Sequence, residues 1–348
     1  MIYLYLTAFS VALVVSLVVT PVAKLLAKKF SVIDKPDSRK IHSKYMPRWG
    51  GIAIYLGFLS GLFVLHFLSR FNILLAFRQK IFVKKELVGI LSLHNQLIGI
   101  LVGATIVFLL GLWDDKKNVP PLPKFLVQII AALAVINYGV NISGLTFPFI
   151  SDYINFSLLV SQIITVFWLI GFMNTINLID GLDGLATGIV AIAASTFFVV
   201  AVLQSDTKIV LVAKQLKLAA ILCAALVGTC IGFLYHNFHP AKIFMGDSGS
   251  QFLGFMLGAI SVIGTLKTTA VVALFIPIIV VALPVLDVAF SIFRRFRSRR
   301  PIMEPDKEHF HHHLLNIGWA HREIVLLVYV ITFVLAFCAI LLTILKGR

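Results

Sequence analysis

Acidic and amide side chains gather in three short segments of this chain, each beside a long apolar run. The first contains Asp114 and Asp115, and the third contains Asp247 in a Gly-Asp-Ser-Gly-Ser stretch. The second has no Lys or Arg but places two amides and two acids within ten residues: Asn174, Asn177, Asp180 and Asp183. Ionisable groups near hydrocarbon are costly and are functional by default, and Mg²⁺ prefers one or two carboxylates together with substrate phosphates. The three segments therefore predict a site that handles a metal ion and phosphate.

Each segment also has a simpler structural explanation. The Asp114–Asp115 pair could be a solvated helix end that the two following lysines neutralise. The stretch around Asp247 could be a helix N-cap, although free backbone N–H groups at such an end also bind anions. An Asx-rich turn explains the glycines of segment 174–184 and one acid, but not two amides and two uncompensated acids. If the preceding helix continues, Asn174 and Asn177 share one face at i, i+3 spacing.

Basic, aromatic and histidine side chains add further candidates. Lys44 and Arg48 lie in a basic, turn-rich stretch and are candidates for phosphate contacts. Phe244 precedes Asp247 by three residues and offers a ring on which a base could stack. Four histidines lie between residues 309 and 313. They could bind zinc, although no Cys accompanies them, or they could bind a diphosphate or shuttle protons.

Long apolar helices must position these segments. The chain has 348 residues, of which 59% are hydrophobic and 13% charged, whereas about a quarter of a soluble domain is charged. Since a helix needs about 20 apolar residues to cross a bilayer, the sequence predicts an all-α integral membrane protein with about ten spans. The apolar runs are Ile2–Ala27, Gly50–Leu68, Leu97–Trp113, Phe125–Val140, Leu158–Met173, Leu185–Leu203, Leu216–Leu234, Gln251–Gly264, Thr269–Phe293 and Glu323–Leu345.

The distribution of Lys and Arg predicts the orientation. The segments after odd-numbered spans carry more cations than the other side, so we expect them to face the cytoplasm and both termini to face outward. These segments are 28–49, 114–124, 174–184, 235–250 and 294–322, and they hold nearly all the candidates for chemistry. The net charge of +15 is then an orientation signal that also attracts anionic lipid, not a nucleic-acid footprint. Residues 1–348 form a single polytopic domain.

One face next to lipid thus combines acids for a divalent cation, amides and glycines for a nucleotide sugar, and cations for phosphates. Phosphoryl transfer depends on positioning and charge neutralisation, and a lipid phosphate and a nucleotide diphosphate are the natural reactants. The competing class is a transporter, but transporters show paired repeats and polar groups near the bilayer midplane. Here no repeat is visible, and the polar groups lie at one interface.

The motifs resemble the polyprenyl-phosphate N-acetylhexosamine-1-phosphate transferases, of the glycosyltransferase family 4 type. The resemblance runs from Asp34 to His313 and includes five motifs in order: D-x-P-x-x-R-K-x-H followed by P-x-x-G-G, the Asp114–Asp115 pair, N-x-x-N-x-x-D-G-L-D-G-L-A, F-M-G-D-S-G-S and H-x-H-H. It implies a UDP-sugar donor, undecaprenyl phosphate as acceptor, Mg²⁺ or Mn²⁺ as cofactor, release of UMP, and the cytoplasmic face of a bacterial inner membrane. Members of the family often pair, so a homodimer is a further expectation.

The resemblance also implies residue roles. Asp247 matches the metal-binding acid, with Asn177 as a second ligand to the diphosphate–metal unit, and one acid of the Asp114–Asp115 pair deprotonates or orients the lipid phosphate. Lys44 and Lys124 match phosphate contacts. The nucleotide pocket is matched by Asn237, Phe244, Asp180 and Asp183, with Asn174 beside it. The histidine motif, which handles the diphosphate or the sugar, is matched by His309, His311 and His312.

The form of the histidine motif resembles the branch of the family that transfers GlcNAc-1-phosphate. His313 stands where many members of that branch have Arg, so the phospho-MurNAc-pentapeptide transferases of peptidoglycan synthesis remain the alternative. We expect direct attack of the lipid phosphate on the β-phosphate of the donor. A covalent phospho-sugar on an Asp is the alternative mechanism.

Overall fold

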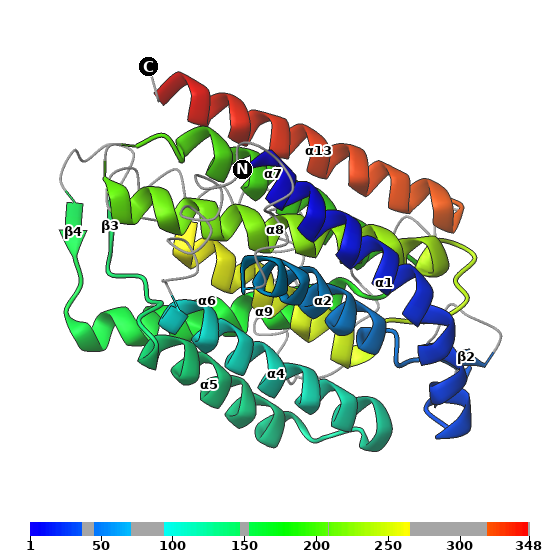
Figure 1. Ribbon diagram of the computed structural model, residues 1–348. Helices are drawn as coiled ribbons and strands as arrows, with labels where there is room; N and C mark the ends of the chain where they lie inside the picture. The colour runs from blue at the N-terminus through cyan, green and yellow to red at the C-terminus, as the bar shows by residue number, and fades with distance from the viewer. Residues whose placement is uncertain (37–44, 71–93, 147–152, 208, 265–318, 347–348) are drawn as a thin grey trace.

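The computed structural model describes residues 1–36, 45–70, 94–146, 153–207, 209–264 and 319–346, and in these residues it confirms an all-α architecture (Figure 1). The helices are α1 (Ile2–Lys29), α2 (Gly51–Arg70), α4 (His94–Lys117), α5 (Pro121–Asn137), α6 (Leu158–Ile179), α7 (Leu185–Gln204), α8 (Val210–Asn237), α9 (Gly246–Gly264) and α13 (His321–Lys346). Seven of them, all except α5 and α9, are long and apolar enough to cross a membrane. The predicted span Thr269–Phe293 lies outside the described residues, so the count of about ten spans stays a prediction.

Two short strand pairs accompany the helices in the described residues. Strand β1 (Ile33–Asp34) pairs antiparallel with β2 (Met46–Pro47), and β3 (Gly144–Thr146) pairs antiparallel with β4 (Tyr153–Asn155). In the first pair Asp34 lies opposite Met46. This hairpin-like contact holds the stretch just before Arg48 against the end of α1.

Small residues explain how α1, α2 and α8 pack together. The buried face of α1 repeats a small residue every four positions: Ala8, Ala12, Ser16 and Thr20. A side chain at Gly228 of α8 would overlap the backbone of Phe9, and the Ser16 hydroxyl donates to the carbonyl of Thr229 at 2.9 Å. Membrane helices without a hydrophobic driving force between them associate by such close contacts.

Large apolar side chains lie exposed on the outside of several helices. Leu25 of α1, Phe167 of α6 and Phe333 of α13 are each at least 64% exposed. Extended exposed apolar surface is unusual for a soluble monomer. It is the surface expected of helices that face lipid.

Helix α9 lies at the centre of the half of the bundle that carries the acids. It packs against α4 and α6 and also contacts α2 and α8, and it runs between them in Figure 1. At Gly111, near the end of α4, an added side chain would overlap the backbone of Ser248 in α9. The absence of a side chain at Gly111 therefore lets the last turn of α4 lie directly against the first turn of α9.

Several helices extend into segments that the sequence predicts as loops. Asp114 and Asp115 lie in the last turn of α4, Lys124 lies in the first turns of α5, and Asp247 lies in the first turn of α9. Helix α6 continues to Ile179, which places Asn174 and Asn177 on one face as expected for a continued helix. The segments 114–124, 174–184 and 235–250 are therefore partly helical, because apolar length marks the hydrocarbon core and polar residues can continue a helix beyond it.

Candidate active site

Asp247 is the meeting point of side chains from four parts of the chain. Its carboxylate lies 3.5 Å from Lys124 Nζ and 3.4 Å from a terminal nitrogen of Arg48. The amide nitrogen of Asn177 donates to the same carboxylate and, at 2.8 Å, to the hydroxyl of Ser250. The structure thus brings together four residues that the sequence analysis singled out: Arg48, Lys124, Asn177 and Asp247.

Asp115 holds the first turn of α9 from the neighbouring helix. Its fully buried carboxylate accepts from the backbone N–H of Asp247 at 2.7 Å, and from the N–H and hydroxyl of Ser248 at 3.2 and 2.7 Å. It therefore satisfies N–H groups at the start of α9 that have no partner within the helix. Gly246 makes this possible, because its φ is +68° and any side chain there would overlap the Asp115 carboxylate.

Asp114 has different surroundings from its neighbour. One oxygen accepts from the backbone N–H of Val119 at 2.8 Å, and the other forms an ion pair with Lys124. Lys124 lies between Asp114 and Asp247 and contacts both carboxylates. Two acids on separate helices therefore share one ammonium group.

Negative charge exceeds positive charge in this cluster, which we call the ionic centre. Arg48 also contacts Asp115 at 3.6 Å and Asp34 at 3.7 Å, so the ionic centre comprises two cations and four acids: Arg48, Lys124, Asp34, Asp114, Asp115 and Asp247. Burial would lower the pKa of Arg48, but the charges of Asp115 and Asp247 raise it above its ordinary value. Arg48 therefore remains charged.

The donor set of the ionic centre fits a divalent cation. Excess carboxylate charge and oxygen ligands are what Mg²⁺ requires, and the Asp247 side chain is 15% exposed whereas that of Asp115 is fully buried. Of these two acids, Asp247 is thus the one that an ion can reach. Asn177 can share that ion only if its amide oxygen turns toward Asp247, because its nitrogen faces the carboxylate here.

A layer of buried amides lies one helical turn below the ionic centre. Gln128 follows Lys124 by four residues, Gln251 follows Asp247 by four, and Asn174 precedes Asn177 by three. Gln128 donates to Gln251 at 3.2 Å and accepts from Asn174 at 3.1 Å. Sequence reasoning missed Gln128 and Gln251 because both were assigned to apolar runs, Gln128 inside one and Gln251 as the first residue of another. Their spacing from Lys124 and Asp247 was the available signal.

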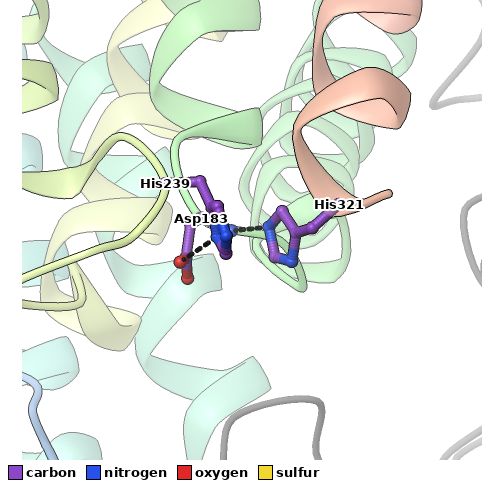
Figure 2. A group of neighbouring side chains, drawn as sticks. All are labelled: Asp183, His239 and His321. Atoms are coloured by element: carbon purple, nitrogen blue, oxygen red, sulfur yellow. Dashed lines mark hydrogen bonds and ion pairs between the residues drawn. The ribbon is translucent and has the colours of Figure 1, made fainter. Parts of the chain in front are cut away.

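Asp183 belongs to a second polar cluster, with His239 and His321 (Figure 2). Its carboxylate lies 2.9 Å from His239 Nδ1 and accepts from the backbone N–H of Ala241 at 3.0 Å. Its own backbone N–H donates to His321 Nε2 at 2.8 Å. His239 stood in a predicted loop and His321 in no motif, so the sequence assigned neither a role.

The other described residues predicted for the pocket are Asp180, Asn237 and Phe244. Burial, and after it the charge of Asp247, raises the pKa of Asp180 well above its ordinary range. Asn237 is buried and closes the loop after α8, because its amide accepts from Thr187 at 3.0 Å and donates to the carbonyl of Ile243 at 3.0 Å. The backbone of Phe244 forms hydrogen bonds with that of Pro47 and Gly50. These bonds join the predicted cytoplasmic segments 28–49 and 235–250.

Four predicted site residues lie outside the described residues: Lys44, His309, His311 and His312. The roles predicted for them stay predictions. The described candidates instead come together at one end of the bundle, from segments more than a hundred residues apart in the chain.

Fold and site together define a polytopic membrane protein whose ionic centre, at one end of the helix bundle, is suited to phosphate chemistry. Comparison with known families agrees with this class. The chain belongs to glycosyl transferase family 4, whose family model matches residues 97–265. That range includes α4 to α9 and so contains Asp114, Asp115, Lys124, Asn177 and Asp247, which confirms the resemblance seen in the sequence.

Curated relatives match nearly the whole chain. A Bacillus subtilis protein named "Probable undecaprenyl-phosphate N-acetylglucosaminyl 1-phosphate transferase" is 36% identical over 335 residues, which cover 96% of this chain and 84% of the relative. The decaprenyl-phosphate N-acetylglucosaminephosphotransferase of Mycobacterium leprae is 34% identical, with coverage of 94% and 81%. A phospho-N-acetylmuramoyl-pentapeptide-transferase of Listeria monocytogenes is 30% identical, with coverage of 93% of each chain.

Proposed function

We propose that this chain transfers N-acetylglucosamine-1-phosphate from UDP-GlcNAc to undecaprenyl phosphate, giving undecaprenyl-diphospho-GlcNAc and UMP. The names of the Bacillus and Mycobacterium relatives support a polyprenyl phosphate acceptor and a GlcNAc-1-phosphate group. The observation that carries the proposal is the convergence of Lys124, Arg48 and Asn177 on Asp247. This product is the first membrane-bound intermediate of a cell-envelope glycan.

The proposed reaction is a direct displacement at phosphorus. An oxygen of the lipid phosphate attacks the β-phosphorus of the donor, the bond from that phosphorus to the bridging oxygen breaks, and UMP leaves with the bridging oxygen. Lys124 and Arg48 neutralise the charge that develops on the phosphates, which is the main requirement of such a transfer. Mg²⁺, for which Mn²⁺ can substitute, would be held by Asp247 and Asn177 and would neutralise further phosphate charge.

The two neighbouring acids are proposed to have different roles. Asp115 already accepts three hydrogen bonds from the start of α9, so it positions Asp247. Asp114, paired with Lys124, is the one that contacts the lipid phosphate. We expect Asp114→Asn to slow transfer about a hundredfold, a typical effect of losing a proton-transfer group, with unchanged thermal unfolding. Asp115→Asn should instead lower the unfolding temperature, and the reverse pattern would exchange the two roles.

The remaining roles follow the family resemblance. Asn174, Asp180, Asp183, Asn237 and Phe244 would form or support the nucleotide pocket, with Lys44, His309, His311 and His312 as further contacts to phosphate or sugar. The bacterial relatives support a bacterial cytoplasmic membrane. The excess of Lys and Arg supports an active site on the cytoplasmic face with both termini outside. A homodimer stays a prediction.

The test uses purified protein in detergent with undecaprenyl phosphate, Mg²⁺ and a panel of UDP-sugars, and it follows the release of UMP. We expect release with UDP-GlcNAc and its loss in EDTA. Release with UDP-MurNAc-pentapeptide alone would keep the reaction type but replace the sugar, in line with the Listeria relative.

Inversion at the β-phosphorus, traced with a chiral donor, would support direct attack, and retention would indicate a covalent phospho-sugar. Folded protein that releases no UMP with any donor would refute the enzyme.

A further inference from the structure

Two side chains of helix α13 bind backbone groups of the turn between α6 and α7. His321, the first residue of α13, accepts a hydrogen bond from the N–H of Asp183 at 2.8 Å. Two helical turns later, the hydroxyl of Tyr329 donates to the carbonyl of Gly184. Two side chains of one helix thus bind two successive backbone groups of one turn.

The packing around this turn leaves room for Tyr329 and fixes the turn from the other side. An added side chain at Gly188, one turn into α7, would overlap the hydroxyl end of Tyr329. On the opposite side, the Asp183 carboxylate contacts His239 and the N–H of Ala241 in the loop after α8. The turn is therefore held between α13 and that loop.

A metal ion is the first alternative for Asp183, His239 and His321, since one ligand atom from each lies within 4.8 Å of the others. The observed geometry argues against it. The imidazole rings stack with centroids 4.4 Å apart and planes 22° apart, so their lone pairs lie in nearly parallel planes and do not converge on one point. Nε2 of His321 is also already the acceptor for the Asp183 N–H.

We propose that His321 and Tyr329 are positioning residues for the sugar-nucleotide donor. They act through the 180–184 turn, whose first residue, Asp180, donates its N–H to the carbonyl of Asn177 at 3.3 Å, and Asn177 contacts Asp247 in the ionic centre. This inference rests on the proposed function. Because Asp114, the acid assigned to the lipid phosphate, lies on α4, loosening the turn raises the KM for UDP-GlcNAc and leaves the KM for undecaprenyl phosphate unchanged.

The variants separate this role from a merely structural one. Tyr329→Phe removes only the hydroxyl, and because it deletes one hydrogen bond, the donor KM should rise about 2- to 10-fold. His321→Leu leaves the Asp183 N–H unpaired and should raise the donor KM by about 10-fold or more. His321→Gln restores an acceptor and should recover most of the loss. Thr332→Val is the matched control, since Thr332 is a buried hydroxyl of the same helix that bonds only within α13 in the described structure.

A second measurement is independent of activity. Hydrogen–deuterium exchange of the peptide covering residues 180–188 should increase in Tyr329→Phe and His321→Leu and remain unchanged in Thr332→Val. Equal rises in both KM values, or unchanged exchange, would overturn the proposal. So would one zinc ion per wild-type chain that is lost in His321→Leu. If wild-type protein turns over no UDP-sugar, the proposed function fails, while the exchange result still decides whether α13 holds the turn.

Discussion

The ionic centre and the Asp183 cluster both place acids near one end of the bundle, but different partners hold them. Asp247 is held by two charged side chains, Lys124 and Arg48, at 3.4–3.5 Å. Asp183 is held by a backbone N–H and an imidazole at 2.9–3.0 Å. Charged side chains at such distances can exchange one anion for another, whereas backbone donors cannot move independently of the fold. The first cluster is therefore suited to binding and releasing phosphates, and the second to keeping a turn in place.

The largest expected contrast comes from neutralising each acid in turn. We expect Asp247→Asn to lower kcat about a thousandfold, the upper range for loss of one electrostatic contact to a transition state. Asp183→Asn keeps an acceptor for the Ala241 N–H and should raise the donor KM no more than about tenfold. Steady-state UMP release measures both. Similar losses of kcat in the two variants would remove the distinction between the clusters.

Glycines with positive φ in the two clusters give the next contrast. Gly246 (φ +68°) would direct a side chain into the Asp115 carboxylate, whereas Gly184 (φ +78°) would meet first a flexible Leu234 side chain at 3.1 Å. Both alanine variants bear the left-handed penalty of about 1–2 kcal/mol, but Gly246→Ala should lower the unfolding temperature considerably further. Gly139→Ala is the control, because Gly139 has φ +84° and nothing within 4 Å. Equal shifts in all three would mean that the α4–α9 contact contributes little.

The smallest expected difference in activity is between replacing Arg48 in the ionic centre and replacing Arg322, which is adjacent to His321 of the Asp183 cluster. Arg48 spans three acids with its planar fork, and a lysine cannot bridge them. Arg48→Lys should therefore reduce kcat/KM about tenfold, a loss of roughly 1.4 kcal/mol. Arg322 lies over the ring of Phe238 at 5.8 Å, a contact that lysine can also make, so Arg322→Lys should be nearly neutral. Comparable effects in the two variants, measured by UMP release, would argue against a special role for Arg48.

The sequence was informative where polarity interrupted an apolar run. Asp114, Asn177 and Asp247 each stood out because charge or amide groups are rare beside hydrocarbon, and the structure brings their segments together. The all-α class followed from apolar length alone. Apolar length did not predict where α4 ends or where α9 begins. The last turn of α4 and the first turn of α9 are polar and still helical.

The partners across helices could not be read from the sequence. Nothing near Asp115 indicates that it caps α9, since the N–H groups that it binds lie 132 and 133 residues away in the chain. Gln128 and Gln251 were hidden because a single amide scarcely changes the hydropathy of a span. His321 was a lone histidine at the start of the final apolar run, and its partner was a backbone group, which no sequence pattern marks.

The position of Asp114 directly after Trp113 has a consequence for how two such different reactants meet. The apolar stretch of α4 ends at Trp113, which is 53% exposed, and Trp is enriched where membranes meet water. The first carboxylate thus follows directly after the last residue of the apolar stretch. Under the proposed function, the acceptor keeps its tail in the bilayer and presents only its phosphate, while the nucleotide arrives from water. The change from apolar to charged surface then falls between Trp113 and Asp114 of α4. The lipid tail can therefore stay in the bilayer and the nucleotide in water while the two phosphates react.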